Sequence, residues 1–306
     1  MINFRNKYIL YFYRINIARQ VFKMITVIMT IYDRDQYYKD ALDSLANQTK
    51  RDFELLIYSN IPVEYDLSKF KDVKVIEDAP VKLTLKYAYG IRKAKHDKIC
   101  FLEDDDTFTP DKIEYLESIN FEYFHNDYNH ITTGEHNPGK GFNMSSIAIN
   151  RKYFPELANA LGNQPELGIP DSFIYWFALE NRLHITLTDK KLTNYRFRNY
   201  KLLQERVLQN LSVQISYLKT ANEYFTSSQV KDIIRARLIS NIIFQNSYDV
   251  KYIKVPLKDM LWLVNQKNIE GKNSKFITYL LTLPMWRNKG IKVIEKFRNK
   301  RISKSA

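Results

Sequence analysis

The chain has 306 residues, 45% of them hydrophobic, and a formal net charge of +13. This length suits one large domain or two smaller ones, and the apolar content can bury a proper core. The single cysteine, Cys100, excludes an intramolecular disulfide, so nothing indicates an oxidising compartment. No stretch approaches the roughly 18 uninterrupted apolar residues that a membrane span needs. Charges interrupt the apolar N-terminus, so we expect no secretory signal.

Most of the positive charge lies at the two ends of the chain. Residues 1–23 contain five basic residues and no acidic one, and residues 285–306 contain eight basic residues and one acidic one. A nucleic-acid-binding protein more often carries its charge on the folded domain, so we expect no nucleic-acid partner. Basic ends rich in aromatic residues suit an anionic membrane surface, and solvated tails are the alternative. We expect a cytoplasmic protein, peripheral on the inner face of the membrane if the ends bind it; Met1 and Met24 both fit as its start.

From residue 25 onward the pattern alternates between strands and helices. Strands are predicted at 25–29, 53–58, 73–76 and 98–102, and helices at 35–48 and 82–95. Strands separated by single helices favour an α/β fold with a mostly parallel sheet and right-handed crossovers. Pro110 then predicts the start of another helix, with Thr109 as its N-cap.

The second half of the chain changes character near residue 200. Residues 126–145 are rich in Gly and Asn and predict a loop, followed by a strand at 146–150, a helix at 171–183 and short strands at 184–188 and 192–197. Long helices are predicted at 202–224, 227–246, 256–267 and 275–300. The chain thus divides into a basic aromatic arm (1–23), an α/β domain (24–200) and a helical region with a basic tail (201–306).

An acidic run at the end of a predicted strand is the most informative feature. Glu103-Asp104-Asp105-Asp106 follows the apolar run Ile99-Cys100-Phe101-Leu102. Such a strand places the carboxylates at the carboxyl edge of the sheet, where α/β proteins bind ligands. Hard oxygen ligands there suit Mg²⁺ or Mn²⁺ and, through the metal, the phosphates of a nucleotide. A solvated acidic turn that caps the next helix is the alternative.

Three other segments stand near predicted strand or helix ends. The first strand runs into Thr30-Ile31-Tyr32-Asp33-Arg34, and the helix after it ends Ser44-Leu45-Ala46-Asn47-Gln48-Thr49. The second strand ends at Ser59-Asn60. The third segment is Pro170-Asp171-Ser172 at a helix start, followed by Leu192-Thr193-Asn194-Tyr195-Arg196-Phe197-Arg198. Each segment taken alone is also compatible with an ordinary turn or cap.

Together and in this order, the four segments over residues 25–200 resemble the family 2 glycosyltransferases, whose α/β fold is called GT-A. The resemblance implies a GT-A, Rossmann-like, mostly parallel sheet flanked by helices, followed here by an α-helical C-terminal region. It also implies that the turn at Thr30, Tyr32 and Asp33 lies against the base of a nucleotide-sugar donor. Asn60 stands where relatives have an acid, and an amide can still pair with a pyrimidine edge.

The same resemblance assigns roles to the acidic residues. Asp105 takes the metal position, with Glu103 and Asp106 beside it. Asp104 falls at a variable position; we assign it to the donor, although it can also face away. Asp171 takes the position of the catalytic base, a role compatible with an N-cap. Arg198 replaces a His that in many relatives approaches the metal or phosphates; Arg cannot bind a cation but can bind a diphosphate bidentately.

We therefore predict an inverting sugar transferase that uses Mg²⁺ or Mn²⁺ and a UDP- or GDP-linked donor. Its acceptor would be a hydroxyl of a glycan, a lipid-linked molecule or a protein. The loop 134–145 either orders over the donor or is a plain surface loop. A nucleotidyltransferase is one alternative, although the Gly-rich loop it usually carries after the first strand is missing from the sequence. A catalytically degenerate scaffold associated with membrane or nucleic acid is the other.

Overall fold

The structure, a computed structural model, describes residues 24–32, 37–131, 143–164, 169–196 and 204–246, together with residues 256, 258, 259 and 262. Its strands are β1 (Ile25–Ile31), β2 (Glu54–Ser59), β3 (Asp72–Ile76), β4 (Lys98–Glu103), β5 (Thr107–Phe108), β6 (Tyr123–His130), β7 (Ile147–Asn150) and β8 (Ile185–Tyr195). Its α-helices are α2 (Tyr38–Ala46), α3 (Leu83–Lys93), α4 (Lys112–Ser118), α5 (Leu157–Gly162), α6 (Pro170–Glu180), α7 (Gln204–Tyr224) and α8 (Ser228–Asn246). Short 3₁₀ turns are η1 (Leu67–Lys69), η2 (Met144–Ser146) and η3 (Arg151–Tyr153).

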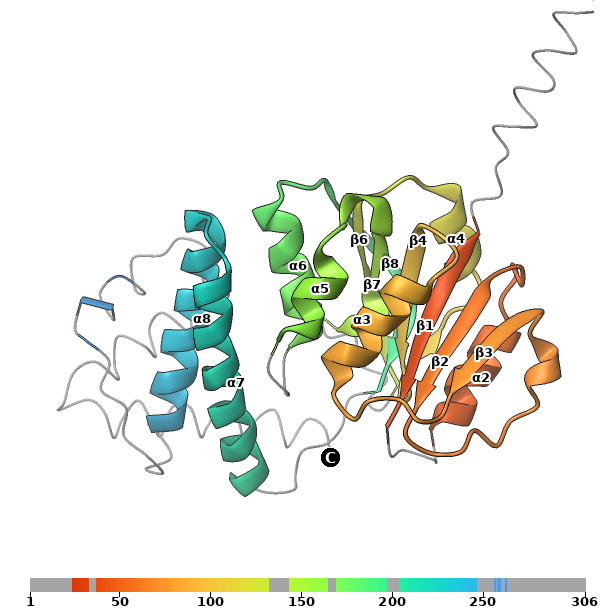
Figure 1. The fold of residues 1–306 in the computed structure, drawn as a ribbon, viewed down its shortest axis with the longest axis horizontal. Helices are drawn as coiled ribbons and strands as arrows, with labels where there is room; N and C mark the ends of the chain where they lie inside the picture. Colours follow the sequence, from red (N-terminus) through yellow and green to blue (C-terminus); the bar gives the residue numbers. More distant parts are fainter. Residues whose placement is uncertain are drawn as a thin grey trace, which may run out of the picture.

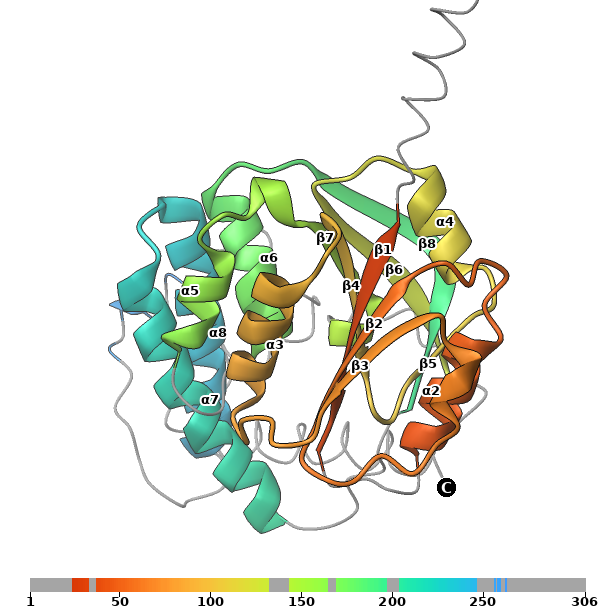
Figure 2. The ribbon, with the colours of Figure 1, turned by 45° about the vertical axis from the view of Figure 1, so that its right-hand side comes forward.

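The strands form one eight-stranded sheet in the order β3-β2-β1-β4-β7-β6-β8-β5. The first four neighbours are parallel, β7 runs antiparallel to both β4 and β6, β6 is parallel to β8, and β5 is antiparallel to β8. Two layers of helices cover the sheet: α2 and α4 lie on one face, and α3, α5 and α6 on the other (Figure 2). The predicted mostly parallel α/β sheet is confirmed.

The first strand has a buried side chain at every position, as expected for a central parallel strand covered on both faces. Alternate residues enter different cores: Val27 packs in the core under α2 and α4, and Ile28 in the core under α3, α5 and α6. Helix α3 approaches β1 so closely that a Cβ added at Gly90 would lie 2.8 Å from two side-chain carbons of Ile28. A glycine is needed there because the helix and the strand meet with no room for a side chain.

The helices α7 and α8 pack outside α6 and share its hydrophobic core (Figure 1). Tyr217 and Phe225 are buried against Trp176, with ring centroids 6.4 Å and 6.1 Å from its ring. The two helices are therefore joined to the α/β body by an apolar interface. None of the helices that the structure describes combines the length and apolar character needed to cross a bilayer.

Several local predictions differ from the structure. The first five residues of the predicted loop at 126–145 are strand, because β6 extends to His130. Asn126 is buried there, and its Nδ2 donates to Thr193 Oγ1 over 3.1 Å. The predicted strands 184–188 and 192–197 are one strand, β8. Thr109 is not the N-cap of α4; Asp111 is, and Thr109 Oγ1 donates to its carboxylate. The short helix α5 was not predicted. The predicted helices 256–267 and 275–300 fall outside the continuously described segments, as does the arm 1–23.

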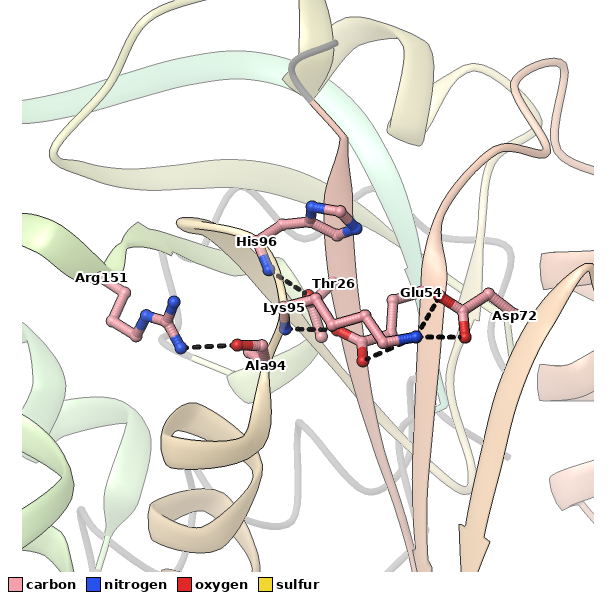
Figure 3. A network of polar contacts seen from close by, with 7 residues as sticks. All are labelled: Thr26, Glu54, Asp72, Ala94, Lys95, His96 and Arg151. Carbon is pink, nitrogen blue, oxygen red and sulfur yellow. Dashed lines mark hydrogen bonds and ion pairs between the residues drawn. The ribbon is translucent and has the colours of Figure 1, made fainter. Parts of the chain in front are cut away.

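A polar network closes the amino edge of the sheet, where the parallel strands begin (Figure 3). The Glu54 carboxylate is 3% exposed and accepts hydrogen bonds from Thr26 Oγ1 at 2.6 Å and from the Lys95 backbone N–H at 2.7 Å. Lys95 Nζ also pairs with Asp72 at 2.7 Å. The network joins the starts of three neighbouring strands to the loop before β4. These bonds hold the strands in register with one another.

Candidate functional site

The opposite, carboxyl edge of the sheet gathers the polar segments predicted from the sequence. In the strand register Thr30 of β1 stands opposite Glu103 of β4, and Ile31 stands opposite Ser59 of β2. The segments that follow these strands therefore begin side by side. Three separate parts of the sequence therefore meet at one place: Thr30 and Tyr32, Ser59-Asn60, and the acidic run.

The acidic run is folded into a tight turn in which the side chains diverge. Asp104 is 2% exposed, and its Oδ2 accepts the backbone N–H of Tyr32 over 3.0 Å. Asp104 therefore does not face away; it joins the end of β4 to the turn after β1. Asp106 is fully buried, and its Oδ1 accepts the backbone N–H of Arg196 over 2.9 Å. The run thus links β1, β4 and the end of β8.

The carboxyl group of Asp106 has an unusually high pKa. Burial, together with the adjacent negative charge of Asp105, raises its pKa to about 7. Its second oxygen, Oδ2, is buried and has no hydrogen-bond partner among the described residues. A buried carboxylate with an unused oxygen is costly, so it needs either a proton or a cation nearby.

Arg196 braces the same turn, and sequence reasoning had not singled it out as a site residue. Its Nε donates to the backbone carbonyl of Asp105 over 3.0 Å, and its Nη2 reaches Asp40 over 3.0 Å. The guanidinium also lies 4.3 Å from the ring centroid of Tyr37. The signal in the sequence was the Tyr195-Arg196 pair of the last motif.

A buried lysine stands on the other side of the turn. Lys86, on α3, is fully buried; its ammonium donates to Ile31 O over 2.9 Å and to Asn60 Oδ1. Burial lowers its pKa to about 8, an effect that the negative charge of Asp104 partly opposes. The ammonium lies 5.5 Å from the ring centroid of Tyr32, whose residue is 45% exposed. The Lys86 ammonium therefore lies beneath the exposed ring of Tyr32. No sequence motif indicates this buried lysine.

The side-chain amide of Asn60 is already hydrogen-bonded at both ends. Its Nδ2 donates to Ala79 O over 2.8 Å, while its Oδ1 accepts from Lys86. These two bonds fix the orientation of the amide. Each end keeps a further hydrogen-bonding capacity, one N–H and one lone pair, for a ligand.

Beneath the acidic run lies a second buried cation, Lys112 of α4. Its Nζ donates to Ser145 O and, over 2.9 Å, to Thr193 Oγ1. Burial lowers its pKa to about 7. Ser145 in turn accepts the backbone N–H of Glu103 on its Oγ over 3.0 Å. This network ties the end of β4 to η2 and β8 from within.

The segment Gln48-Thr49, just after the end of α2, has a structural role at this edge. Gln48 Nε2 donates to Thr109 O over 2.8 Å, and Gln48 Oε1 accepts the backbone N–H of Ile113 over 3.1 Å. The Thr49 N–H donates to Pro110 O over 2.8 Å. The end of α2 therefore holds the segment that leads from the acidic run into α4.

Asp171 lies in the first turn of α6, after Pro170. The N-cap is Ile169, so the alternative of Asp171 as the N-cap is wrong. The helix dipole still stabilises a negative charge at Asp171, because this residue lies in the first turn. Its Oδ1 accepts the backbone N–H of Ser172 over 2.6 Å. Burial of the carboxyl raises its pKa, which makes it a stronger base than an ordinary aspartate.

Tyr87 of α3 lies at the end of β1. Its buried hydroxyl lies 3.4 Å from Thr30 Oγ1. Burial raises its pKa well above the ordinary value, and the negative charges of Glu103, Asp104 and Asp171 add to the effect.

The arrangement suits a metal only in a particular way. Among the residues that the structure describes, no group of three or more His, Cys, Asp or Glu side chains could hold a metal ion by itself. Mg²⁺ is commonly held by one or two carboxylates together with substrate phosphates. The unused Asp106 Oδ2 and the neighbouring Asp105 fit that mode. The predicted donor residues Asp33 and Arg198 lie outside the described residues.

The fold resembles that of TarS from S. aureus. The crystal structure of residues 1–349 of TarS from S. aureus in complex with UDP-GlcNAc superposes with a TM-score of 0.54 at 15% identity, covering 92% of this chain and 89% of that one. The longer TarS structure gives a TM-score of 0.51 at 14% identity and covers 79% of this chain and 47% of that one. The architecture is therefore that of a GT-A glycosyltransferase.

The sequence comparisons define the family. The family model of glycosyl transferase family 2 matches residues 26–182, just over half of the chain, so the chain belongs to that family. An O-antigen biosynthesis glycosyltransferase, WbnJ, of Escherichia coli is 29% identical over 103 residues, 31% of this chain and 41% of WbnJ. An uncharacterized glycosyltransferase of Haemophilus influenzae is 28% identical over 195 residues, 60% of this chain and 63% of that protein. The chain spans less than two thirds of the length of these curated relatives.

Proposed function

We propose that this enzyme moves a sugar from a nucleoside-diphosphate donor, UDP- or GDP-linked, to a hydroxyl acceptor with inversion at the anomeric carbon. The observation that carries the proposal is the meeting of Thr30, Asn60 and the acidic run at one sheet edge. The UDP-GlcNAc complex of TarS supports a nucleotide-sugar donor. We further propose residues 24–200 as the transferase domain, followed by the helical region 201–306.

The donor would lie across the ends of β1, β2 and β4. The exposed ring of Tyr32, with the Lys86 ammonium beneath it, offers a face for the base. Asn60 presents its remaining amide N–H and lone pair to the base edge, and Asp104 holds the turn that carries Tyr32. Thr30 and Asp33 would complete the base side, and Arg198 would bind the diphosphate.

The diphosphate would rest against the acidic run. Asp105 would hold Mg²⁺ or Mn²⁺, with Glu103 and Asp106 beside it. A divalent cation there neutralises the negative charge that a diphosphate leaving group gathers as the glycosidic bond breaks. The chain itself contributes rigidity, because Arg196, Ser145 and Lys112 hold the turn from two sides.

Asp171 would act on the acceptor. Its carboxylate takes the proton of the acceptor hydroxyl as the oxygen attacks the anomeric carbon. The bond from that carbon to the phosphate oxygen breaks, and the nucleoside diphosphate leaves with the bonding electrons. A single displacement of this kind inverts the configuration. The acceptor would be a glycan, a lipid-linked molecule or a protein, and the basic ends 1–23 and 285–306 would bring the enzyme to an anionic membrane surface.

A nucleotide-sugar panel tests the proposal. UDP-glucose, UDP-galactose, UDP-GlcNAc and GDP-mannose are offered with and without Mn²⁺ to wild type, Asp105→Ala and Asp171→Asn, and release of the nucleoside diphosphate is measured. We expect turnover of at least one donor by wild type and loss of turnover in both variants. If folded wild type neither binds nor hydrolyses any donor, the proposed function is wrong. If Asp171→Asn retains full turnover, the base is another residue.

A further inference from the structure

The helix that carries Asp171 is held by α8 next to that carboxylate. Arg237 Nη1 donates to Ser172 Oγ over 2.7 Å, and the Ser172 N–H donates to Asp171 Oδ1 over 2.6 Å. Ser172 is 1% exposed, whereas Arg237 is an exposed residue. An arginine from the helical region therefore reaches a buried hydroxyl directly adjacent to the proposed base.

A second contact fixes the other end of the same helix. The Glu180 carboxylate accepts the Thr226 hydroxyl over 2.6 Å and the backbone N–H groups of Thr226 and Ser227 over 2.9 Å and 3.1 Å. Glu180 lies at the end of α6, and Ser227 stands directly before α8. The beginning of α8 thus meets the end of α6, and Arg237 further along α8 meets its beginning. Two polar contacts, one near each end of α6, therefore fix the position of α6 along the axis of α8.

The apolar interface between these two contacts prevents α6 from rotating against α8. Val230 and Ile234 of α8 are fully buried in the core that includes Phe173 and Trp176 of α6. The Arg237 guanidinium lies 5.9 Å from the ring centroid of Trp176. A helix held at both ends and packed between them cannot rotate without breaking buried contacts.

The groups coupled electrostatically to Asp171 come from four elements. They are Tyr87 of α3, Tyr123 of β6, Tyr217 of α7 and Arg237 of α8. The tyrosines stay neutral, because burial raises the pKa of each further above its ordinary value. The positive charge in this set is Arg237, and it favours the ionised form of Asp171 against the effect of burial.

We propose that Arg237 is a positioning residue for the transfer reaction. By holding Ser172 it orients the Asp171 carboxylate, and its positive charge opposes the effect of burial on that carboxyl. The helical pair α7–α8 thereby completes the transferase site instead of only being attached to it. This inference rests on the proposed role of Asp171 as the base.

The test compares two arginines of α8. Arg235 is the matched control, because it stands two residues before Arg237 but pairs with Asp259 and lies 4.3 Å from the ring centroid of Trp262. Hydrolysis of UDP-GlcNAc, or of whichever panel donor turns over fastest, is followed against pH for wild type, R237Q, R237K and R235Q. We expect R237Q to lower kcat roughly 10- to 100-fold, the loss that misplacing a catalytic group by about 1 Å can cause. We expect the KM for the donor to stay unchanged.

The pH profile separates positioning from general structural damage. Without the guanidinium the pKa of Asp171 rises, so the acidic limb of kcat moves to higher pH in R237Q and returns toward wild type in R237K. R235Q keeps the wild-type kcat and profile. In an Asp171→Asn background R237Q should have no further effect on kcat, because its influence acts through the lost carboxylate.

Several results would overturn the inference. One is a wild-type kcat and pH profile in R237Q; another is an equal loss in R237Q and R235Q without a shift of the acidic limb. If R237Q does not fold, Ser172→Ala decides, since it removes the bond and leaves the arginine: unchanged kcat there rejects the role. Full activity of Asp171→Asn would instead reject the proposed base, which distinguishes the two failures.

Discussion

The two edges of the sheet use charge in opposite ways. At the amino edge, Glu54 is matched by Thr26 and by Lys95, and Lys95 is matched by Asp72 (Figure 3). There Lys95, from the loop before β4, lies between two acids of the neighbouring strands β2 and β3. At the carboxyl edge four acidic residues follow one another, and the buried Asp106 Oδ2 has no hydrogen-bond partner among the described residues.

We propose that the carboxyl edge is the ligand edge of this sheet and that the amino edge is structural. Both edges contain buried acids and lysines, so charge content alone does not tell them apart. The carboxyl edge differs by its four consecutive acidic residues, whose mutual repulsion a bound cation would relieve.

The largest effect on activity should come from Asp105. Asp105→Ala removes a carboxylate from the edge that we propose to hold the metal and diphosphate, and we expect kcat to fall roughly 100-fold or more. The melting temperature should change little. Activity is measured as nucleoside diphosphate release, with Glu54→Gln at the other edge as the matched acidic control. Comparable losses in both variants at full folding would contradict the division between the edges.

Lys112 should make stability depend on pH. Its pKa is about 7 in the folded chain and near 10.5 in the unfolded one, so between these values the unfolded chain binds one more proton. The contribution of this group to the free energy of unfolding should therefore rise with pH across this window, by up to about 1.4 kcal/mol per pH unit, and be constant below pH 7. Lys112→Met should remove this contribution in urea unfolding at pH 7, 8 and 9. An identical slope in both proteins would show that Lys112 stays charged when buried.

Glu54 should matter for stability and not for chemistry. Glu54→Ala leaves the Thr26 hydroxyl and the Lys95 N–H without their buried acceptor, which should cost about 1–3 kcal/mol of unfolding free energy. The KM for the donor and kcat per folded molecule should remain at wild-type values. Denaturant unfolding and the hydrolysis assay measure the two quantities. A selective drop in kcat would mean that the amino edge takes part in the reaction.

The smallest effect is expected for Lys95. Its side chain is 58% exposed, so its ion pair with Asp72 is screened by solvent and contributes little. Lys95→Gln should leave hydrolysis unchanged and lower the melting temperature less than Glu54→Ala does. A larger shift than that of Glu54→Ala would reverse the order of importance within the amino-edge network.

The sequence predicted the regular parts of the fold well, because buried parallel strands such as β1 and β4 read as continuous apolar runs. It missed β6, where Asn126 and Asp127 resemble turn residues; the strand exists because Asn126 finds its partner on β8, far along the chain. Tertiary context decided that segment, not local preference.

The site was predictable in part for the same reason. Short motifs at strand ends predicted Glu103, Asp105 and Asp106, and the family pattern predicted Asp171; their roles remain proposals. Lys86 and Lys112 stand within helical patterns that give no hint of burial, so only the packed structure shows them beside the acidic turn. Arg237 could not be predicted either, because its role depends on how α8 lies along α6.

The central claim is that the donor binds at the carboxyl edge, and hydrogen exchange of the backbone amides tests it most directly. The full chain is compared alone, with UDP, with GDP, and with each in the presence of Mn²⁺. With at least one of these nucleotides we expect slower exchange at residues 30–32, 59–61 and 103–106, and no change at residues 53–55, 72–74 and 95–97. Protection confined to the amino edge, or no protection with any nucleotide, would contradict the account.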